Sequence, residues 1–359
     1  MRRQPLPILM LLAFALVVDC GSAKAAYDPI GRGVVRLSLH PGFKRFLGRE
    51  GIELKARDGG TVSSGGSAIA LPAVGGRIDP TMLKGTIETS GEVVLIRGRK
   101  KLAIRDLTLK SKRTPLFARV GGGQQKVVSA GRVFIRREGF GALFVAHPLR
   151  LTFKTATRLD KRLDVASFSP GQLIGSLRAS VSPSTICLLP TGDAVITLDP
   201  SFQAKLKSLF VAVTPIFPAE ANAGSFQLPV EGRSAISQTA TEGILRTGGS
   251  LEFLQLGGGP LFWHEAWLDL GAGAGTSEAD VEPSPPYAGR VGRTATLDFD
   301  LTAAARSADP SAHTISESGA PIRLDAGMAA DFDQAFAEGR HLFDPGEAIG
   351  ALSFGVTTQ

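Results

Sequence analysis

The chain has 359 residues, of which 43 are glycine and 22 are proline, while methionine and tyrosine are scarce. This composition is typical of many short strands joined by turns. After the N-terminal segment, the sequence has no apolar stretch of about 18 residues, which argues against a permanent membrane-spanning helix. The formal net charge of +7 conceals a strong division of charge along the chain.

The first residues have the three parts of a secretory signal peptide. Arg2 and Arg3 precede an apolar run over residues 8–18, and Ala23-Lys24-Ala25 offers a small-x-small cleavage site. We therefore expect residues 1–25 to be removed and the protein to be secreted, either extracellular or at the cell surface. Cys187 is then the remaining cysteine, so we expect no disulfide within the mature chain.

The rest of the chain reads as two diverged copies of one unit. Residues 37–43 (Leu-Ser-Leu-His-Pro-Gly-Phe) match residues 196–202 (Ile-Thr-Leu-Asp-Pro-Ser-Phe), and further matches follow in the same order along both copies. A fixed order of matches over this length indicates a duplication. We expect a first repeat over residues 27–182 and a second repeat over residues 184–359.

Most segments of each repeat have the pattern of strands with one buried face. Residues 35–39 and 149–153 alternate apolar and polar side chains. One helix is expected to begin at Pro41, and a second is expected over residues 156–163, whose apolar spacing recurs at 329–336. The sequence predicts a mainly β chain with two tandem antiparallel sandwich or barrel-like domains, each with one or two short helices.

The two repeats differ sharply in charge. Residues 27–183 hold 28 Lys and Arg against 11 Asp and Glu, a net charge of +17, and residues 184–359 hold 9 against 21, a net charge of −12. The repeats are therefore expected to attract each other or an oppositely charged neighbour. Solvated charged faces and contact with an anionic wall polymer or lipid are the alternatives. Nucleic acid is not expected as a partner of an exported protein.

The sequence lacks the motifs that carry common enzyme mechanisms. It has no Gly-x-Ser-x-Gly, no His-Glu-x-x-His, no Walker loop and no Cys-x-x-Cys, and its five histidines are scattered singly. We expect neither catalysis nor a metal site. Residues 261–267 contain both tryptophans of the chain, and a buried core strand is favoured there over a ligand-stacking platform.

The repeated pattern of an early Phe-containing helix, a central Gly-x-x-x-x-x-Gly strand and a late helix resembles the HtaA domain. This resemblance implies an exported domain that binds haem, with iron held by the tyrosine of a Ser-Phe-x-x-Tyr helix. The matching positions of this chain are Phe46, in Gly-Phe-Lys-Arg-Phe, and Lys205, in Ser-Phe-Gln-Ala-Lys. The family's tyrosine is therefore absent from both repeats, and so is its central Gly-His.

The resemblance gives the candidate ligand-binding residues, which are His40, Phe43, Phe46, Phe202 and Lys205. His40 lies beside the first expected helix and is a substitute iron ligand, so haem is a candidate cofactor although none is certain. We expect a secreted, non-catalytic HtaA-like protein that binds haem, another small hydrophobic ligand or an envelope component. The alternative function is a structural or adhesion module of the cell envelope.

Overall fold

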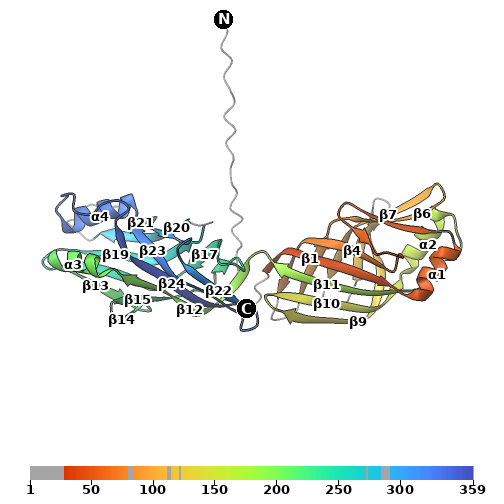
Figure 1. The fold of residues 1–359 in the computed structure, drawn as a ribbon, viewed down its shortest axis with the longest axis horizontal. Helices are drawn as coiled ribbons and strands as arrows, with labels where there is room; N and C mark the ends of the chain where they lie inside the picture. Colours follow the sequence, from red (N-terminus) through yellow and green to blue (C-terminus); the bar gives the residue numbers. More distant parts are fainter. Residues whose placement is uncertain are drawn as a thin grey trace, which may run out of the picture.

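The computed structural model describes residues 28–79, 84–110, 115–120, 123–271, 274–283 and 292–358. The expected signal peptide, residues 1–25, lies outside the described residues. Two closed sheets with short helices lie side by side along the long axis of the molecule (Figure 1). Within the described parts of the chain, no helix combines the length and apolar character needed to cross a membrane.

The described residues of the first domain form eleven strands and two helices. Its strands are β1 (Asp28–Leu39), β2 (Glu53–Arg57), β3 (Thr61–Val62), β4 (Ala68–Asp79), β5 (Lys84–Thr89), β6 (Glu92–Arg97), β7 (Lys100–Lys110), β8 (Pro115–Val120), β9 (Gly123–Glu138), β10 (Gly141–Leu151) and β11 (Leu173–Pro183). Its helices are α1 (Pro41–Arg49) and α2 (Phe153–Leu163).

The second domain repeats this plan, with thirteen strands and two helices in the part of it that the structure describes. Its strands are β12 (Ile186–Leu198), β13 (Val211–Ile216), β14 (Glu220–Asn222), β15 (Ser225–Pro229), β16 (Ala235–Ile236), β17 (Gly243–Arg246), β18 (Ser250–Gln255), β19 (Pro260–Asp269), β20 (Ala274–Pro283), β21 (Gly292–Asp300), β22 (Ala305–Asp309), β23 (Thr314–Leu324) and β24 (Ala348–Thr358). Its helices are α3 (Pro200–Ser208) and α4 (Ala326–Phe336).

The strand order shows that each domain is a closed antiparallel sheet. The first follows β2-β6-β7-β5-β4-β1-β11-β10-β9-β8, and an added pairing of β7 with β8 closes eight of these strands into a ring. The second follows β13-β18-β19-β17-β16-β12-β24-β23-β21-β20, and β19 pairs with β20 in the same way. The predicted mainly β class is confirmed. The sequence left a sandwich and a barrel-like form open for each domain, and both domains take the barrel-like form.

Helix α1 begins at the predicted Pro41, whereas α2 begins at Phe153, before the predicted range 156–163. His40 caps the N-terminus of α1, which starts at Pro41, and Thr152 caps α2 by accepting a hydrogen bond from the Thr155 amide. In Figure 1 both helices lie at the end of the first domain that faces away from the second domain. Their buried faces pack onto the open end of the sheet, and this packing positions the site described below.

The two domains are joined by a short connection and by side-chain contacts. β11 ends at Pro183, and the Ser184 amide donates a hydrogen bond to the Pro29 carbonyl at 2.8 Å. Phe140, in the turn between β9 and β10, is 5 % exposed and belongs to the hydrophobic core of the second domain. The aromatic ring of one domain therefore completes the core of the other.

Cys187 lies on β12 at this junction and is disulfide-bonded. The expectation of no disulfide concerns the mature chain, so this bond of the full-length chain does not test it. That expectation assumed that cleavage of the signal removes Cys20, the other cysteine of the sequence, which lies outside the described residues. The role of Cys187 is structural, because its side chain is fully buried and its amide donates a hydrogen bond to Asp28 Oδ1 at 2.9 Å.

Candidate functional site

A cavity of about 110 Å³ lies inside the closed sheet of the first domain. Its walls are aliphatic side chains of β1, β2, β4 and β6 to β11, together with Phe43 from α1 and Leu159 from α2. Among the described lining residues, Thr155 is the one with a polar side chain. Its hydroxyl lies 2.9 Å from the Thr152 hydroxyl and donates to the Lys126 carbonyl at 3.3 Å. The cavity therefore suits a molecule that makes van der Waals contacts and needs no hydrogen bond.

The corresponding space in the second domain is almost filled. A cavity of about 30 Å³ remains there, between Phe202, Phe253, Trp263, Met328 and Phe332 and smaller aliphatic side chains. This volume is about that of one water molecule, so nothing larger is accommodated without rearrangement. The two domains share a fold but differ in the space that they enclose.

Strand register shows which substitutions fill the second domain. Val93 lies opposite Ile104 across β6 and β7, and at the matching place Leu251 lies opposite Trp263 across β18 and β19. Each of these strand pairs occupies the same place in its sheet, so Trp263 takes the position of Ile104. The replacement of an aliphatic side chain by an indole accounts for much of the lost volume.

A second replacement of this kind lies on the late helix. Leu159 of α2 corresponds to Phe332 of α4 in the repeat, and both side chains line the interior of their domain. Phe332 packs against Phe253 with ring centroids 5.0 Å apart. The aromatic rings of the second domain thus contact one another in the region that the first domain leaves open.

The candidate site residues of the first repeat lie on or beside α1. Phe43 and Phe46 are buried, their rings stack with centroids 5.8 Å apart, and Phe46 also meets Phe168 edge-on at 5.1 Å. Phe43 lines the cavity. His40 is exposed, and its Nδ1 accepts a hydrogen bond from the Gly42 amide at 3.2 Å. The structure therefore brings Phe43 to the cavity, whereas His40 is not among the residues that line it.

The candidate residues of the second repeat lie on α3. Phe202 is 1 % exposed and packs between Phe332 and Phe343, with centroids 6.3 and 6.2 Å away. Lys205 Nζ lies 2.7 Å from both carboxylate oxygens of Glu347 and 4.5 Å from the centre of the Phe343 ring. The ammonium group is thus held in an ion pair with Glu347, which it would have to leave in order to reach an iron atom.

A second, more polar hollow of about 530 Å³ opens on the second domain. It is lined by Phe217, Pro218, Glu231, Gly248, Gly249, Ser250, His264 and Glu265. Ser250 and His264 face each other across β18 and β19, with Oγ and Nδ1 2.6 Å apart. Ser250 is 7 % exposed, and this pair is a contact between two neighbouring strands that line the hollow.

The tryptophan segment forms β19, and its two indoles have different surroundings. Trp263 is 2 % exposed and donates from Nε1 to Thr296 Oγ1 at 3.0 Å, which confirms the predicted core strand. The guanidinium groups of Arg246 and Arg293 lie over the Trp267 ring, at 4.4 and 4.0 Å from its centre. The Trp267 ring therefore already makes cation–π contacts within its own domain.

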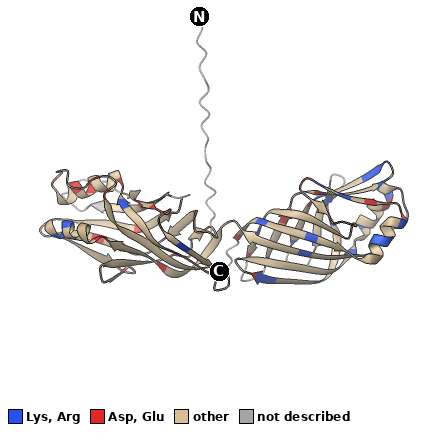
Figure 2. Ribbon diagram, in the orientation of Figure 1, with Lys and Arg blue, Asp and Glu red and all other residues tan. Residues whose placement is uncertain are grey.

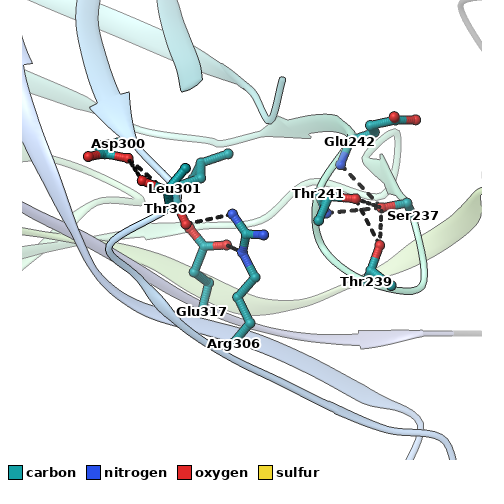
Figure 3. Close-up of polar contacts among 9 residues, drawn as sticks. All are labelled: Ser237, Thr239, Thr241, Glu242, Asp300, Leu301, Thr302, Arg306 and Glu317. Carbon is teal, nitrogen blue, oxygen red and sulfur yellow. Dashed lines mark hydrogen bonds and ion pairs between the residues drawn. The ribbon is translucent and has the colours of Figure 1, made fainter. Parts of the chain in front are cut away.

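Two further polar clusters of the second domain hold loops in place (Figure 3). Arg306 Nε donates to Glu317 Oε2 at 2.9 Å, and Arg306 Nη2 donates to the Leu301 carbonyl at 2.6 Å. In the other cluster, Ser237 Oγ accepts hydrogen bonds from the amides of Thr241 and Glu242.

In the described parts of the chain, no group of three or more His, Cys, Asp or Glu is arranged to hold a metal ion.

Sequence reasoning did not find the cavity. Its lining residues read as ordinary core positions of alternating strands, and Phe43 was the one cavity residue among the candidate site residues. A signal was present in the repeat alignment, because bulky residues of the second repeat stand at the places of smaller residues in the first. A comparison of side-chain volumes at matched positions would have revealed it.

No protein-family model matches the chain, and no curated protein matches it. Among solved structures, the C-terminal domain of HtaA from Corynebacterium glutamicum is 22 % identical with a TM-score of 0.39, and the match covers 48 % of this chain and 99 % of that chain. The N-terminal domain of HtaA from the same organism is 17 % identical with a TM-score of 0.34, and the match covers 46 % of this chain and 97 % of that chain. The chain is similar to HtaA domains, each of which spans about half of it.

Proposed function

We propose that this chain is an exported, non-catalytic binding protein that holds a small apolar molecule inside its first domain. The observation that carries the proposal is the cavity of about 110 Å³ with aliphatic walls. Packed protein interiors leave few voids larger than a water molecule, and an apolar void of this size stays dry and takes up apolar guests. The export is inferred from the signal-like N-terminal sequence.

The size of the cavity defines the class of ligand. An engineered cavity of roughly 150 Å³ lined by similar side chains binds benzene, so a small hydrocarbon ring or a short alkyl chain suits this one. Haem is much larger and requires an iron ligand. The side chains at the ligand position of the resembled family are Phe46, which cannot ligate iron, and Lys205, which is paired with Glu347. We therefore propose an apolar ligand in preference to haem.

The test is the binding of toluene to the protein without its first 25 residues, measured as the shift in melting temperature. A ligand at about 100 times its Kd stabilises the folded state by about 2.7 kcal/mol. The variant Ile104→Trp fills the cavity with the side chain that the second domain has at this position, and it is expected to abolish the shift. The control Val34→Trp adds the same bulk at a position that is 52 % exposed, and it should leave the shift intact.

Two results would count against this proposal. One is a melting temperature that toluene does not change in the unmodified protein, and the other is an equal shift in Ile104→Trp. A haem titration completes the experiment, because a saturable Soret band that is lost in His40→Ala would favour the haem function instead.

The division of charge favours a second candidate function, attachment to an envelope component. The first repeat carries a net charge of +17 and the second a net charge of −12. If attachment is electrostatic, purified envelope should retain the protein at low salt and release it at about 0.5 M NaCl, where the Debye length is only a few ångströms. Absence of retention at any salt concentration would exclude this function.

A further inference from the structure

Positive charge is concentrated at the end of the first domain that carries α1 and α2 (Figure 2). Nine exposed Lys and Arg residues on these helices and on the hairpin between β6 and β7 form what we call the basic end. They are Lys44, Arg45, Arg49, Arg99, Lys100, Lys101, Lys154, Lys161 and Arg162.

Few of these charges are neutralised by neighbouring carboxylates. Lys100 Nζ lies 2.6 Å from Asp164 Oδ2, and this pair is exposed. Asp160 Oδ1 accepts hydrogen bonds from the amides of Ser167 and Phe168, so it serves the loop that follows α2. Glu50 is half-buried at the C-terminus of α1. The basic end therefore keeps a large positive excess.

Arg97 holds the elements of the basic end together. Its Nε donates to the Glu50 carbonyl at 3.0 Å, and its Nη1 donates to the carbonyls of Leu163 and Asp164. Glu50 and Asp164 are the C-terminal caps of α1 and α2, so one guanidinium group satisfies the last carbonyls of both helices. The basic residues are thus presented on one fixed surface.

The same end of the second domain lacks this charge. Helix α3 carries Lys205, paired with Glu347, and Lys207, whereas α4 carries Asp331 and Asp333 and no basic residue. The hairpin that corresponds to Arg97–Lys100 has no charged residue over 255–260. The fold therefore does not require a basic end, and the charge in the first domain needs another explanation.

An aromatic side chain accompanies the cations. Phe153 is the first residue of α2 and is 70 % exposed, next to Lys154. An exposed aromatic ring beside several cations on a helical surface is the combination that binds an anionic membrane surface, with the ring at headgroup level and the cations near phosphates. A soluble anionic polymer would use the cations but would give the ring no apolar phase to enter.

We infer that the basic end docks on a lipid bilayer that exposes anionic headgroups. The two helices of the basic end also cover the cavity, because Phe43 of α1 and Leu159 of α2 are among its lining residues. Docking would place the helical cover of the cavity against the bilayer, where apolar molecules concentrate. The inference rests on the placement of charge and goes beyond the proposed binding function.

The experiment is co-sedimentation of the protein without its first 25 residues with phosphatidylglycerol-containing vesicles and with phosphatidylcholine vesicles. We expect binding to the anionic vesicles alone, weakened by NaCl. The triple variant Arg45→Gln, Lys101→Gln, Lys161→Gln should bind on the order of a hundredfold more weakly, because each cation near such a surface contributes about fivefold in affinity.

The matched control removes three charges from the outer faces of β1, β9 and β11. It is the variant Arg36→Gln, Arg132→Gln, Arg178→Gln, whose residues are exposed and lie outside the basic end. This control should lose much less affinity than the triple variant of the basic end. Phe153→Ser should weaken binding to the anionic vesicles and should remove most of the vesicle binding that persists at high salt.

Three outcomes would overturn the inference. They are equal losses in the two triple variants, binding to the uncharged vesicles as strong as to the anionic ones, and retention on a soluble anionic polymer without binding to vesicles. The toluene shift, measured in the absence of vesicles, should be unchanged in both triple variants. Failure of docking and failure of the proposed cavity function are therefore separate results.

Discussion

Ile104 of β7 and Trp263 of β19 occupy the same position in the two domains. Each lies opposite the second residue of the preceding strand, which is Val93 of β6 for Ile104 and Leu251 of β18 for Trp263. Trp263 is buried and fills the interior of its domain, whereas Ile104 faces the cavity of the first domain. One position therefore determines much of the difference between an open interior and a filled one.

Trp263→Ile should open a cavity in the second domain and destabilise it. The change removes buried volume and the hydrogen bond from Trp263 Nε1 to Thr296 Oγ1, so we expect a loss of about 3–5 kcal/mol in the free energy of unfolding. Urea unfolding followed by the fluorescence of Trp267 measures this loss. The same variant should gain toluene binding, and in the double variant with Ile104→Trp the binding should move from the first domain to the second. A second domain that remains as stable as before would show that Trp263 is not essential to its core.

The strands and helices were predictable because their signals are local. The alternation over 35–39 corresponds to β1, where Val35 and Leu39 are buried, and Pro41 after the capping residue His40 marks the start of α1. The cavity was not predictable in this way. It depends on whether side chains such as Leu95 and Leu159, far apart in the sequence, meet across the interior, and this follows from the closure of the sheet.

The junction between the domains was equally hidden from the sequence. Phe140 stands in a turn between two strands of the first domain, where an aromatic residue gives no sign of its partner. Its burial in the second core follows from the relative position of the domains. The charge division, by contrast, is a property of the sequence, and the structure adds that much of the positive part faces away from the second domain (Figure 2).

Phe140→Ala should destabilise the second domain although the residue belongs to the first. Its ring is 5 % exposed within the second core, and truncation of a buried phenylalanine costs about 3–5 kcal/mol. Both tryptophans lie in the second domain, so tryptophan fluorescence during urea unfolding reports this domain selectively. The control Phe134→Ala, at a position of the same hairpin that is 54 % exposed, should change the stability by less than about 0.5 kcal/mol. Equal effects of the two variants would mean that the ring of Phe140 does not contribute to the second core.

Arg306→Met should destabilise the second domain by leaving the carboxylate of Glu317 without its cation. Glu317 is 2 % exposed, and burial raises its pKa while Arg306 opposes the rise. Loss of the partner of a buried charge costs about 3–5 kcal/mol, and since Arg306 is itself partly exposed we expect about 2–4 kcal/mol. The double variant Arg306→Met, Glu317→Gln should recover part of this loss, because it leaves no buried charge. A double variant less stable than Arg306→Met would contradict the explanation.

Asp28→Asn should stabilise the protein at neutral and alkaline pH. Burial raises the pKa of Asp28 from 3.8 to about 7, although the Cys187 amide and the nearby charge of Arg137 oppose the rise, and Asp79 adds to it slightly. Asp28 Oδ2 is buried, and no described residue forms a hydrogen bond with it. Between pH 4 and pH 7 the folded protein therefore binds a proton that the unfolded chain has released. It follows that the stability contributed by neutral Asp28 is complete below pH 4 and is lost as the pH rises through 7.

Asparagine cannot lose this proton and still offers an oxygen to the Cys187 amide, while Arg137 keeps its hydrogen bonds to Thr358 Oγ1 and to the Gly139 carbonyl. The variant should gain on the order of 2–4 kcal/mol over the unmodified protein at pH 8, since each pKa unit corresponds to about 1.4 kcal/mol. The difference should shrink steadily as the pH falls from 7 to 4, which urea unfolding at several pH values measures. A difference independent of pH would show that Asp28 ionises at its ordinary pKa in the folded protein, and that the junction of the two domains admits water to this carboxyl group.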